Sequence, residues 1–399
     1  MFLARRLSGF GALVLAAAAL YFTGLAAWSD WVSRDATRAG ILAAIRMTPE
    51  NWTLYRMWGE FVPADGVAAL NGAVARNPVN PQLRLESAEV LEAAGRNGEA
   101  ETRLLEAVSL DRTATARVLA AEFYFRRGDE AHFLGSARGA LAVAEKGDAE
   151  IFREYWAISN GQVGDVVPNR PEILPDYLDF LIDSRRFDAA ERVGTELMRV
   201  RRDKKGRAAR VLMKYCTAMA REGRAEQAVA AWNWLARERA IPYAALGERA
   251  QEWVTDGDFQ RELGDGAGFE WRRTDAVFSE WVEKSRELRV TFSGKQPERC
   301  EVLSQEVALW PGREYWLRVK YEMRGIGAES GLRWKVALRD GRVLGEAAMP
   351  GGVDSVEMRF GGDLQGAAMA RLVLEYERAL GTVRIEGEVA IRNVASGWR

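Results

Sequence analysis

Three patterns of hydrophobic and polar residues follow one another along the chain. An uncharged apolar stretch runs from Leu7 to Ser29, a region rich in Ala, Leu, Arg and Glu follows, and apolar and polar residues alternate after Thr255. The second pattern is typical of helices and the third of half-buried strands. We therefore predict a multidomain α + β protein with a membrane anchor or signal segment over 1–31, helical repeats over 32–255 and an antiparallel β-sandwich over 256–399.

The apolar stretch is about as long as a helix that crosses a bilayer. Arg5 and Arg6 precede it, and Trp28 and Trp31 stand at its far end, where an aromatic belt would lie. The basic pair should stay inside, so we predict a single-pass anchor in the inner (cytoplasmic) membrane, with the following domains periplasmic or otherwise extracytoplasmic. The alternative is a signal peptide cleaved near Gly24-Leu25-Ala26, which also places the rest of the chain outside the cytoplasm.

The helical region repeats small and large apolar residues with a period of about 33 residues. Small residues allow two antiparallel helices to approach closely, larger ones fill the space between them, and a glycine ends the first helix. The spacing resembles the tetratricopeptide repeat, in about five units. The matching positions are Ala88, Leu91, Gly95, Ala100, Leu104 and Ala107; Ala121, Tyr124, Gly128 and Ala140; Leu178, Leu181 and Ala190; and Cys216, Met219, Gly223, Ala228 and Trp232.

The period breaks between about 145 and 176, where prolines and glycines predict a loop between two blocks of repeats. The resemblance implies a superhelix whose concave face binds a peptide or another protein, and the alternative is a plain spacer. The basic run Arg199–Arg207 is interpreted as a solvated helix end or as a contact with anionic lipid or polymer. His132 is expected to be a surface or interhelix residue.

The C-terminal region shows period-2 alternation with turn signals between the segments. Apolar residues that share one face are Leu288, Val290 and Phe292; Tyr315, Leu317, Val319 and Tyr321; Leu332, Trp334, Val336 and Leu338; Leu372, Leu374 and Tyr376; and Val383, Ile385, Val389 and Ile391. Asp340-Gly341 is a two-residue hairpin signature. Eight or nine short strands with one apolar face predict an antiparallel sandwich.

The details of this region resemble a carbohydrate-binding module with a jelly-roll, galactose-binding-like fold. The phrases that carry the resemblance are Asp256-Gly-Asp-Phe259, Pro311-Gly-Arg-Glu-Tyr315 and Ile391-Arg-Asn-Val394. They cover core and turn positions over about 140 residues, so they indicate the fold rather than a ligand. Asp256 departs from the family, which usually has Asn there.

Sugar binding needs exposed aromatic faces and a few polar side chains. Trp316 alternates with the apolar set of its strand and should share the outer face with Arg318, so we name both as candidate ligand-binding residues, together with Trp271 and Trp310. Trp281 is a further candidate. The alternative is that these tryptophans cover the sheet against the repeat domain.

Composition narrows the chemistry further. Basic and acidic residues number 56 and 57, so no global basic field supports nucleic-acid binding. The single histidine excludes multi-histidine metal sites and limits histidine-based catalysis to His132, which could still serve singly. Cys216 and Cys300 are interpreted as two separately buried thiols, with an interdomain disulfide as the alternative.

The motifs that the sequence contains and those that it lacks limit its possible functions. The chain shows no G-x-S-x-G and no P-loop motif, and we expect no catalytic activity, cofactor or metal. We predict a non-catalytic envelope scaffold that binds an unidentified envelope protein through its repeats, in polysaccharide assembly or export. A membrane-tethered glycan-binding protein, with polysaccharide as the partner, is the alternative.

Overall fold

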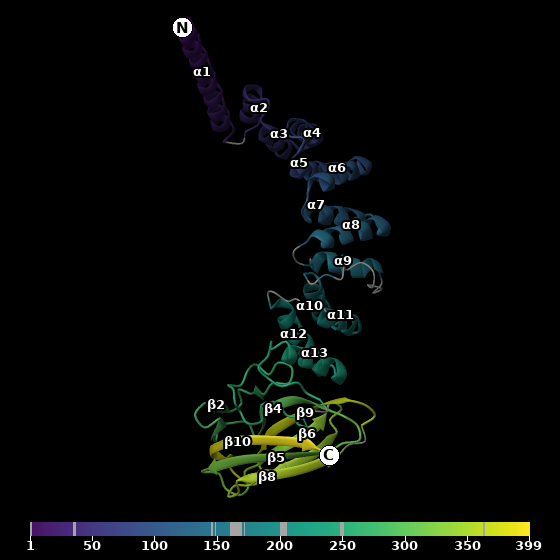
Figure 1. Cartoon of the computed structure of the whole chain (residues 1–399), viewed down its shortest axis with the longest axis vertical. Helices are drawn as coiled ribbons and strands as arrows, with labels where there is room; N and C mark the ends of the chain where they lie inside the picture. Colours follow the sequence, from purple (N-terminus) through teal and green to yellow (C-terminus); the bar gives the residue numbers. More distant parts are fainter. Residues whose placement is uncertain are drawn as a thin grey trace. The chain divides into compact units, whose positions relative to one another are not determined.

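The computed structural model describes residues 2–399 except 35–36, 145–146, 148, 160–169, 171, 200–205, 248–250 and 362–363, with the side chains of these residues from 15 onward except 63, 155, 158 and 159. The chain forms two compact units, Met1–Pro168 and Asn169–Arg399. The first is helical, whereas the second contains both helices and the sandwich (Figure 1). The units therefore divide the helices instead of following the change of pattern at Thr255.

The first unit is a series of antiparallel helix pairs. Its elements are α1 (Phe2–Ser33), α2 (Arg38–Met47), α3 (Trp52–Phe61), η1 (Pro63–Asp65), α4 (Gly66–Arg76), α5 (Pro81–Ala93), α6 (Asn97–Leu110), α7 (Thr115–Arg126), α8 (Glu130–Val143) and α9 (Ala149–Ser159). Helices α3 and α4, α5 and α6, and α7 and α8 pack as pairs. Among the first helices of successive pairs, α5 also contacts α7, and α7 contacts α9.

Local sequence explains where these helices begin and end. Asn80 caps α5, because its side-chain oxygen accepts a hydrogen bond from the Gln82 amide at 2.9 Å, and Pro81 occupies the first helical turn. Gly95 follows the helix with φ of +72°, a conformation that glycine adopts without steric cost. Gly128 and Gly223 repeat this arrangement after α7 and α12, which confirms the predicted helix ends.

The small residues of the predicted repeat lie where the helices touch. Ala88, Ala100 and Ala107 are at most 2% exposed, and Leu91 fills the space beside them. The equivalent positions of the later units are also buried: Ala121, Tyr124, Ala140, Leu178, Leu181, Ala190, Cys216, Met219, Ala228 and Trp232. The helical repeat and its register are therefore confirmed.

The predicted loop between about 145 and 176 is wrong in its first part. Helix α9 occupies Ala149–Ser159 and packs on α7 and α8, with Ile151 and Phe152 buried. These apolar residues give α9 a buried inner face like those of the other first helices. In the sequence, the nearby prolines and glycines obscured this helical pattern. Residues 160–169, with most of the proline- and glycine-rich sequence, lie outside the described part.

The apolar N-terminal stretch lies within α1, whose last turns pack on α2. Ser29 is buried there, and its hydroxyl is 2.8 Å from that of Thr48. The side chains of residues 1–14 lie outside the described part, and with them those of residues 7–14 of the predicted membrane segment. Among the residues that are described, no helix is sufficiently long and apolar to span a membrane.

The second unit begins with two more helix pairs. They are α10 (Leu174–Asp183), α11 (Phe187–Arg199), α12 (Arg207–Arg221) and α13 (Ala225–Arg237). Ion pairs join the first helices, since Lys214 contacts Asp179 at 2.5 Å and Asp183 at 2.7 Å. Most of the basic run Arg199–Arg207 falls outside the described residues.

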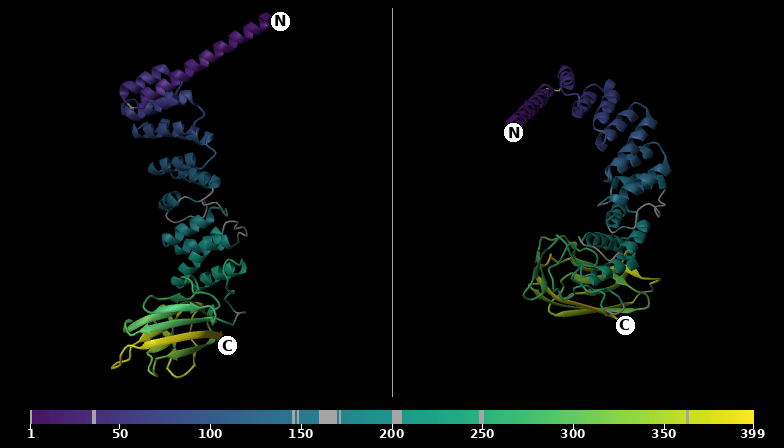
Figure 2. Two further views of the ribbon diagram at one scale, coloured as in Figure 1. Left: turned by 90° about the vertical axis from the view of Figure 1, so that its left-hand side faces the viewer. Right: turned by 45° about the horizontal axis from the view of Figure 1, so that its top comes forward.

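The C-terminal part is an antiparallel sandwich of two five-stranded sheets, seen as two layers in Figure 2. Sheet A has the order β1-β4-β9-β6-β7 and sheet B the order β2-β3-β10-β5-β8. Without β1 and β2, these are the two four-stranded sheets of a jelly roll. The strands are β1 (Arg272–Arg273), β2 (Phe278–Val282), β3 (Glu287–Ser293), β4 (Arg299–Leu309), β5 (Glu314–Arg324), β6 (Leu332–Leu338), β7 (Val343–Ala348), β8 (Ser355–Gly361), β9 (Ala368–Glu377) and β10 (Glu386–Trp398).

The alternation predicted for β3, β5, β6 and β9 is confirmed, because their apolar sets face the shared core. Two details of the prediction are wrong. Val383 precedes β10 and is 86% exposed, so it belongs to a loop. The hairpin around Asp340 has three loop residues, because Leu338 pairs with Arg342 and Gly341 takes φ of +87°, which adds a bulge after the turn.

The hairpin of α12 and α13 packs against the sandwich on the side of sheet A (Figure 1). The Gly268 amide donates a hydrogen bond to the Thr217 hydroxyl at 2.8 Å. The ring of Trp232 meets Phe269 edge-on, with centroids 5.5 Å apart. The last repeat and the sandwich are therefore one packed body, and the outer face of sheet B lies on the other side of the sandwich.

The two cysteines are free thiols. Cys216 is buried in α12, beside Gly268, as predicted, whereas Cys300 on β4 is only half-buried. The alternative of an interdomain disulfide is therefore wrong.

Candidate functional site

Trp316 lies on the outer face of β5, half-buried among polar residues. It is paired across the strands with Gly397 of β10. A Cβ atom at Gly397 would come within 2.7 Å of the indole, so the ring lies directly over the glycine backbone. Glycine is therefore required at residue 397, because any side chain there would displace the ring.

Trp316 is supported from the inner side of the sheet by Trp253. The Trp253 indole N–H donates to the backbone oxygens of Trp316 and Gly397, both at 3.2 Å. Trp253 and Val254 precede the predicted boundary at Thr255, yet both belong to the sandwich core. The backbone beneath the Trp316 ring is thus fixed by a buried side chain from outside the predicted domain.

Arg318 lies on the same face and donates two hydrogen bonds to one carboxylate oxygen of Glu357 of β8, at 2.7 and 3.1 Å. Arg359 binds the other oxygen of Glu357 at 3.2 Å. Hydrogen bonds from these two guanidinium groups hold the pKa of Glu357 below its ordinary value. Together with Trp316 and Arg399 these residues line a recess of about 210 Å³, which we name the Trp316 recess.

The other tryptophan candidates do not join this recess. Trp271 is only 2% exposed and packs in the core against Trp334, so the prediction that it contacts a ligand is wrong. Its indole N–H donates to the Asp256 carbonyl, which shows that the ring serves the core. Trp310 is half-buried beside Trp398, with its backbone held by the Tyr315 hydroxyl. Trp281 is likewise half-buried and donates to Phe259.

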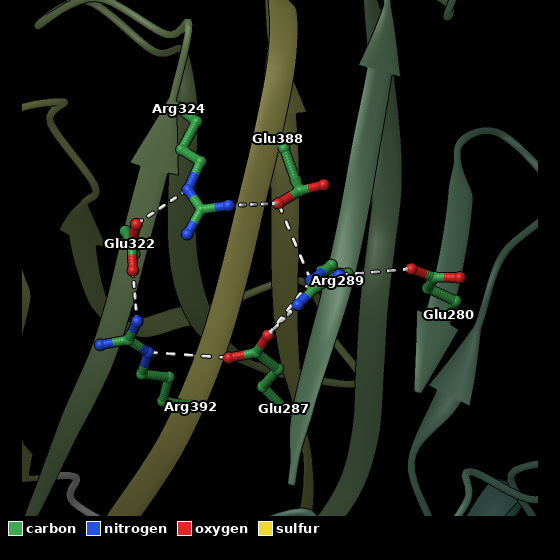
Figure 3. Close-up of polar contacts among 7 residues, drawn as sticks. All are labelled: Glu280, Glu287, Arg289, Glu322, Arg324, Glu388 and Arg392. Atoms are coloured by element: carbon green, nitrogen blue, oxygen red, sulfur yellow. Dashed lines mark hydrogen bonds and ion pairs between the residues drawn. The ribbon is translucent and has the colours of Figure 1, made fainter. Parts of the chain in front are cut away.

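A closed ring of ion pairs crosses the middle of the same face (Figure 3). Arg289, Arg324 and Arg392 alternate around it with Glu287, Glu322 and Glu388, and Glu280 adds a further contact to Arg289. Arg289 lies 2.7 Å from Glu287, and Arg324 lies 3.8 Å from Glu388. The ring spans β3, β10 and β5 and holds its side chains in fixed positions.

A second recess of about 680 Å³, the Phe278 recess, lies at the other end of this face. It is lined by β2, by the segment before it and by outward-facing Thr291 and Ser293 of β3. Phe278 is 66% exposed at its rim. Gln296 is only 4% exposed and also lines the recess. Sequence reasoning missed this site, although the alternation of Thr291 with Val290 and Phe292 already assigns Thr291 to the outer face.

The first helices of the repeats carry a separate polar surface, the first-helix face, made of charged residues on α3, α5 and α7. Its residues are Arg56, Glu60, Glu86, Glu89, Glu92, Glu122 and Arg126. Arg56 contacts Glu86 at 2.8 Å and Arg126 contacts Glu92 at 2.9 Å, so ion pairs link neighbouring first helices. Glu89 is exposed between these pairs.

His132 is a surface residue near the start of α8, as predicted. Its side chain is 63% exposed, lies 2.8 Å from Asp129 and stacks on the ring of Tyr124. Among the residues that the structure describes, no group of three or more His, Cys, Asp or Glu side chains is arranged to hold a metal ion.

These features define the class of the protein as a helical-repeat protein with a C-terminal antiparallel sandwich. No protein-family model matches the chain, and no curated protein matches it. Solved structures that are similar to parts of it include Pseudomonas aeruginosa pilF, with 14% identity over 55% of this chain and 90% of that one and a TM-score of 0.27. The TPR protein YrrB gives 11% identity over 52% and 95%, with a TM-score of 0.25.

The sandwich is similar to the module CBM1 of BiXyn10A, with 14% identity over 35% of this chain and 94% of that one and a TM-score of 0.24. The helix pairs and the strand order of the two sheets define the fold of this chain.

Proposed function

We propose that the chain is a non-catalytic scaffold of the cell envelope, whose helical repeats bind a protein partner in polysaccharide assembly or export. The observation that carries this proposal is the first-helix face. Its charged side chains project from three first helices that ion pairs link in sequence, while the small residues that pack the helices are buried. Five Glu against two Arg favour a partner segment that carries Lys or Arg.

Attachment to the inner membrane through residues 7–29, with the remaining chain outside the cytoplasm, is part of the proposal. It is supported by Arg5 and Arg6 before a stretch without charges. Resistance of the full-length chain to alkaline carbonate extraction tests the attachment. Release into the soluble fraction, with a mature N-terminus near Ala27, would instead establish a cleaved signal peptide.

Reversing the charge of Glu89 tests the protein-binding role. We expect Glu89→Lys to reduce cross-linking and recovery of a partner from an envelope extract about tenfold, because the new charge repels a basic segment. Glu130→Lys, the same change on the second helix α8, is the matched control and should bind normally. Equal recovery by both variants and the unaltered chain would show that the first-helix face is not the binding surface.

The alternative function is a membrane-tethered glycan-binding protein. The observation that favours it is the Trp316 ring, which lies over a glycine and beside the paired guanidinium groups of Arg318 and Arg359. An indole face stacks on the C–H groups of a sugar ring, and fixed planar polar groups bond its hydroxyls.

Truncating the Trp316 ring separates this alternative from a structural role. We expect Trp316→Ala to change the free energy of unfolding by less than about 1 kcal/mol, since the side chain lies on the outer face. The same variant should lose retention on polysaccharide in affinity electrophoresis. A large loss of stability with normal retention would mean that the ring serves only to cover Gly397.

A further inference from the structure

The two recesses of the sandwich lie on one face of sheet B, at opposite ends of its strands. Phe278 is paired with Thr291, and Thr291 with Glu388 of β10. Trp316 is paired with Gly397 of the same strand. The path along β10 from Glu388 to Gly397 covers roughly 30 Å at about 3.3 Å per residue. No single sugar unit reaches both recesses, whereas a chain of several units does.

The ion-pair ring between the recesses carries polar groups whose charges are paired with one another. The ring of Figure 3 and the adjoining Glu280 together comprise three Arg and four Glu, each in contact with an opposite charge. At the ring itself, an anionic polymer would have to break these pairs before it could contact a cation. Hydroxyl groups can instead add hydrogen bonds to guanidinium and carboxylate groups that remain paired. Because the ion pairs already fix these side chains, little further ordering is needed when a ligand binds.

Each end of this path offers an aromatic ring to the ligand. Phe278 is 66% exposed, and the Trp316 ring lies flat over Gly397. Among the described residues of the sandwich, Phe278 is the one aromatic side chain that is mostly exposed. A large ring left open at the rim of a recess is a typical contact for the apolar face of a ligand.

We propose that the outer face of sheet B binds one uncharged, linear polysaccharide chain that runs from the Phe278 recess across the ion-pair ring to the Trp316 recess. This inference rests on the glycan-binding alternative above and adds the length, the charge and the second contact point of the ligand. Contact at two ends makes the second contact intramolecular, so affinity should rise with chain length until both recesses are filled.

The test uses the full-length chain and a series of uncharged β-linked gluco-, xylo- and manno-oligosaccharides, from disaccharides to octasaccharides, in calorimetric titrations. Polygalacturonate serves as the anionic probe. We expect octasaccharides of the preferred sugar to bind at least about tenfold more tightly than disaccharides. Phe278→Ala should remove about tenfold of octasaccharide affinity and leave disaccharide binding at Trp316 unchanged. Leu380→Ala, at a loop position that is 99% exposed, is the matched control.

The outcomes separate this inference from the function on which it rests. Binding without dependence on length, or with normal affinity in Phe278→Ala, overturns the spanning chain but leaves a glycan site at Trp316. Tighter binding of polygalacturonate than of every uncharged oligomer overturns the proposed charge of the ligand. If the chain binds none of these probes although its thermal midpoint shows that it is folded, the inference and the glycan-binding alternative are both overturned.

Discussion

Replacing Trp232 with alanine should destabilise the second unit by about 3–5 kcal/mol, as expected for the loss of a fully buried large aromatic side chain. The Trp232 side chain is 0% exposed and stacks on Tyr243 at 5.4 Å. It also meets Phe269 edge-on, and its N–H donates to the Ala244 carbonyl at 3.2 Å. The substitution therefore leaves a cavity at the point where α13, the following segment and the sandwich meet.

Denaturant unfolding of the full-length chain measures this loss, and limited proteolysis locates it. Cleavage should become faster near Tyr243 and Phe269, which Trp232 contacts. Phe278→Ala removes an exposed aromatic side chain from the same unit and should leave both measurements unchanged. A loss below about 1 kcal/mol for Trp232→Ala would show that the joint is held elsewhere.

The helical repeats could be predicted from the sequence because their signal is local. Ala88, Gly95 and Ala100 each report a contact or a helix end within one helix pair, and the structure confirms all three. The alternation along β5 is local in the same way, and it correctly assigns Trp316 to the outer face. Such positions are fixed by the periods of helix and strand, so neighbouring residues reveal them.

Features that depend on long-range contacts could not be predicted in this way. Trp271 occurs in a segment without clear alternation, and its burial follows from its contact with Trp334, 63 positions further along the chain. The Phe278 recess is likewise formed by a loop, an edge strand and the outer face of β3. The union of α12 and α13 with the sandwich depends on Gly268, which has no side chain and leaves room for Cys216 and Trp232.

Trp253 gives the second large expected effect, and it links stability to the candidate site. The ring is 2% exposed and meets Tyr315 and Phe360 edge-on, at 6.0 and 5.5 Å. Trp253→Ala should therefore cost about 3–5 kcal/mol in denaturant unfolding. The backbone amides of Trp253 and Val254 also donate to the Ser396 hydroxyl, so their segment is held directly against β10.

The more informative variant is Trp253→Phe, which keeps a ring in the core but removes the N–H that binds the Trp316 and Gly397 carbonyls. We expect it to lower the free energy of unfolding by about 1–2 kcal/mol and to weaken ligand binding at the Trp316 recess, since those carbonyls belong to the strands beneath the indole. Tyr376→Phe, which removes a single hydrogen-bonding hydroxyl from the same core, controls for stability alone. If both variants bind ligand equally well, Trp253 stabilises the sandwich without positioning Trp316.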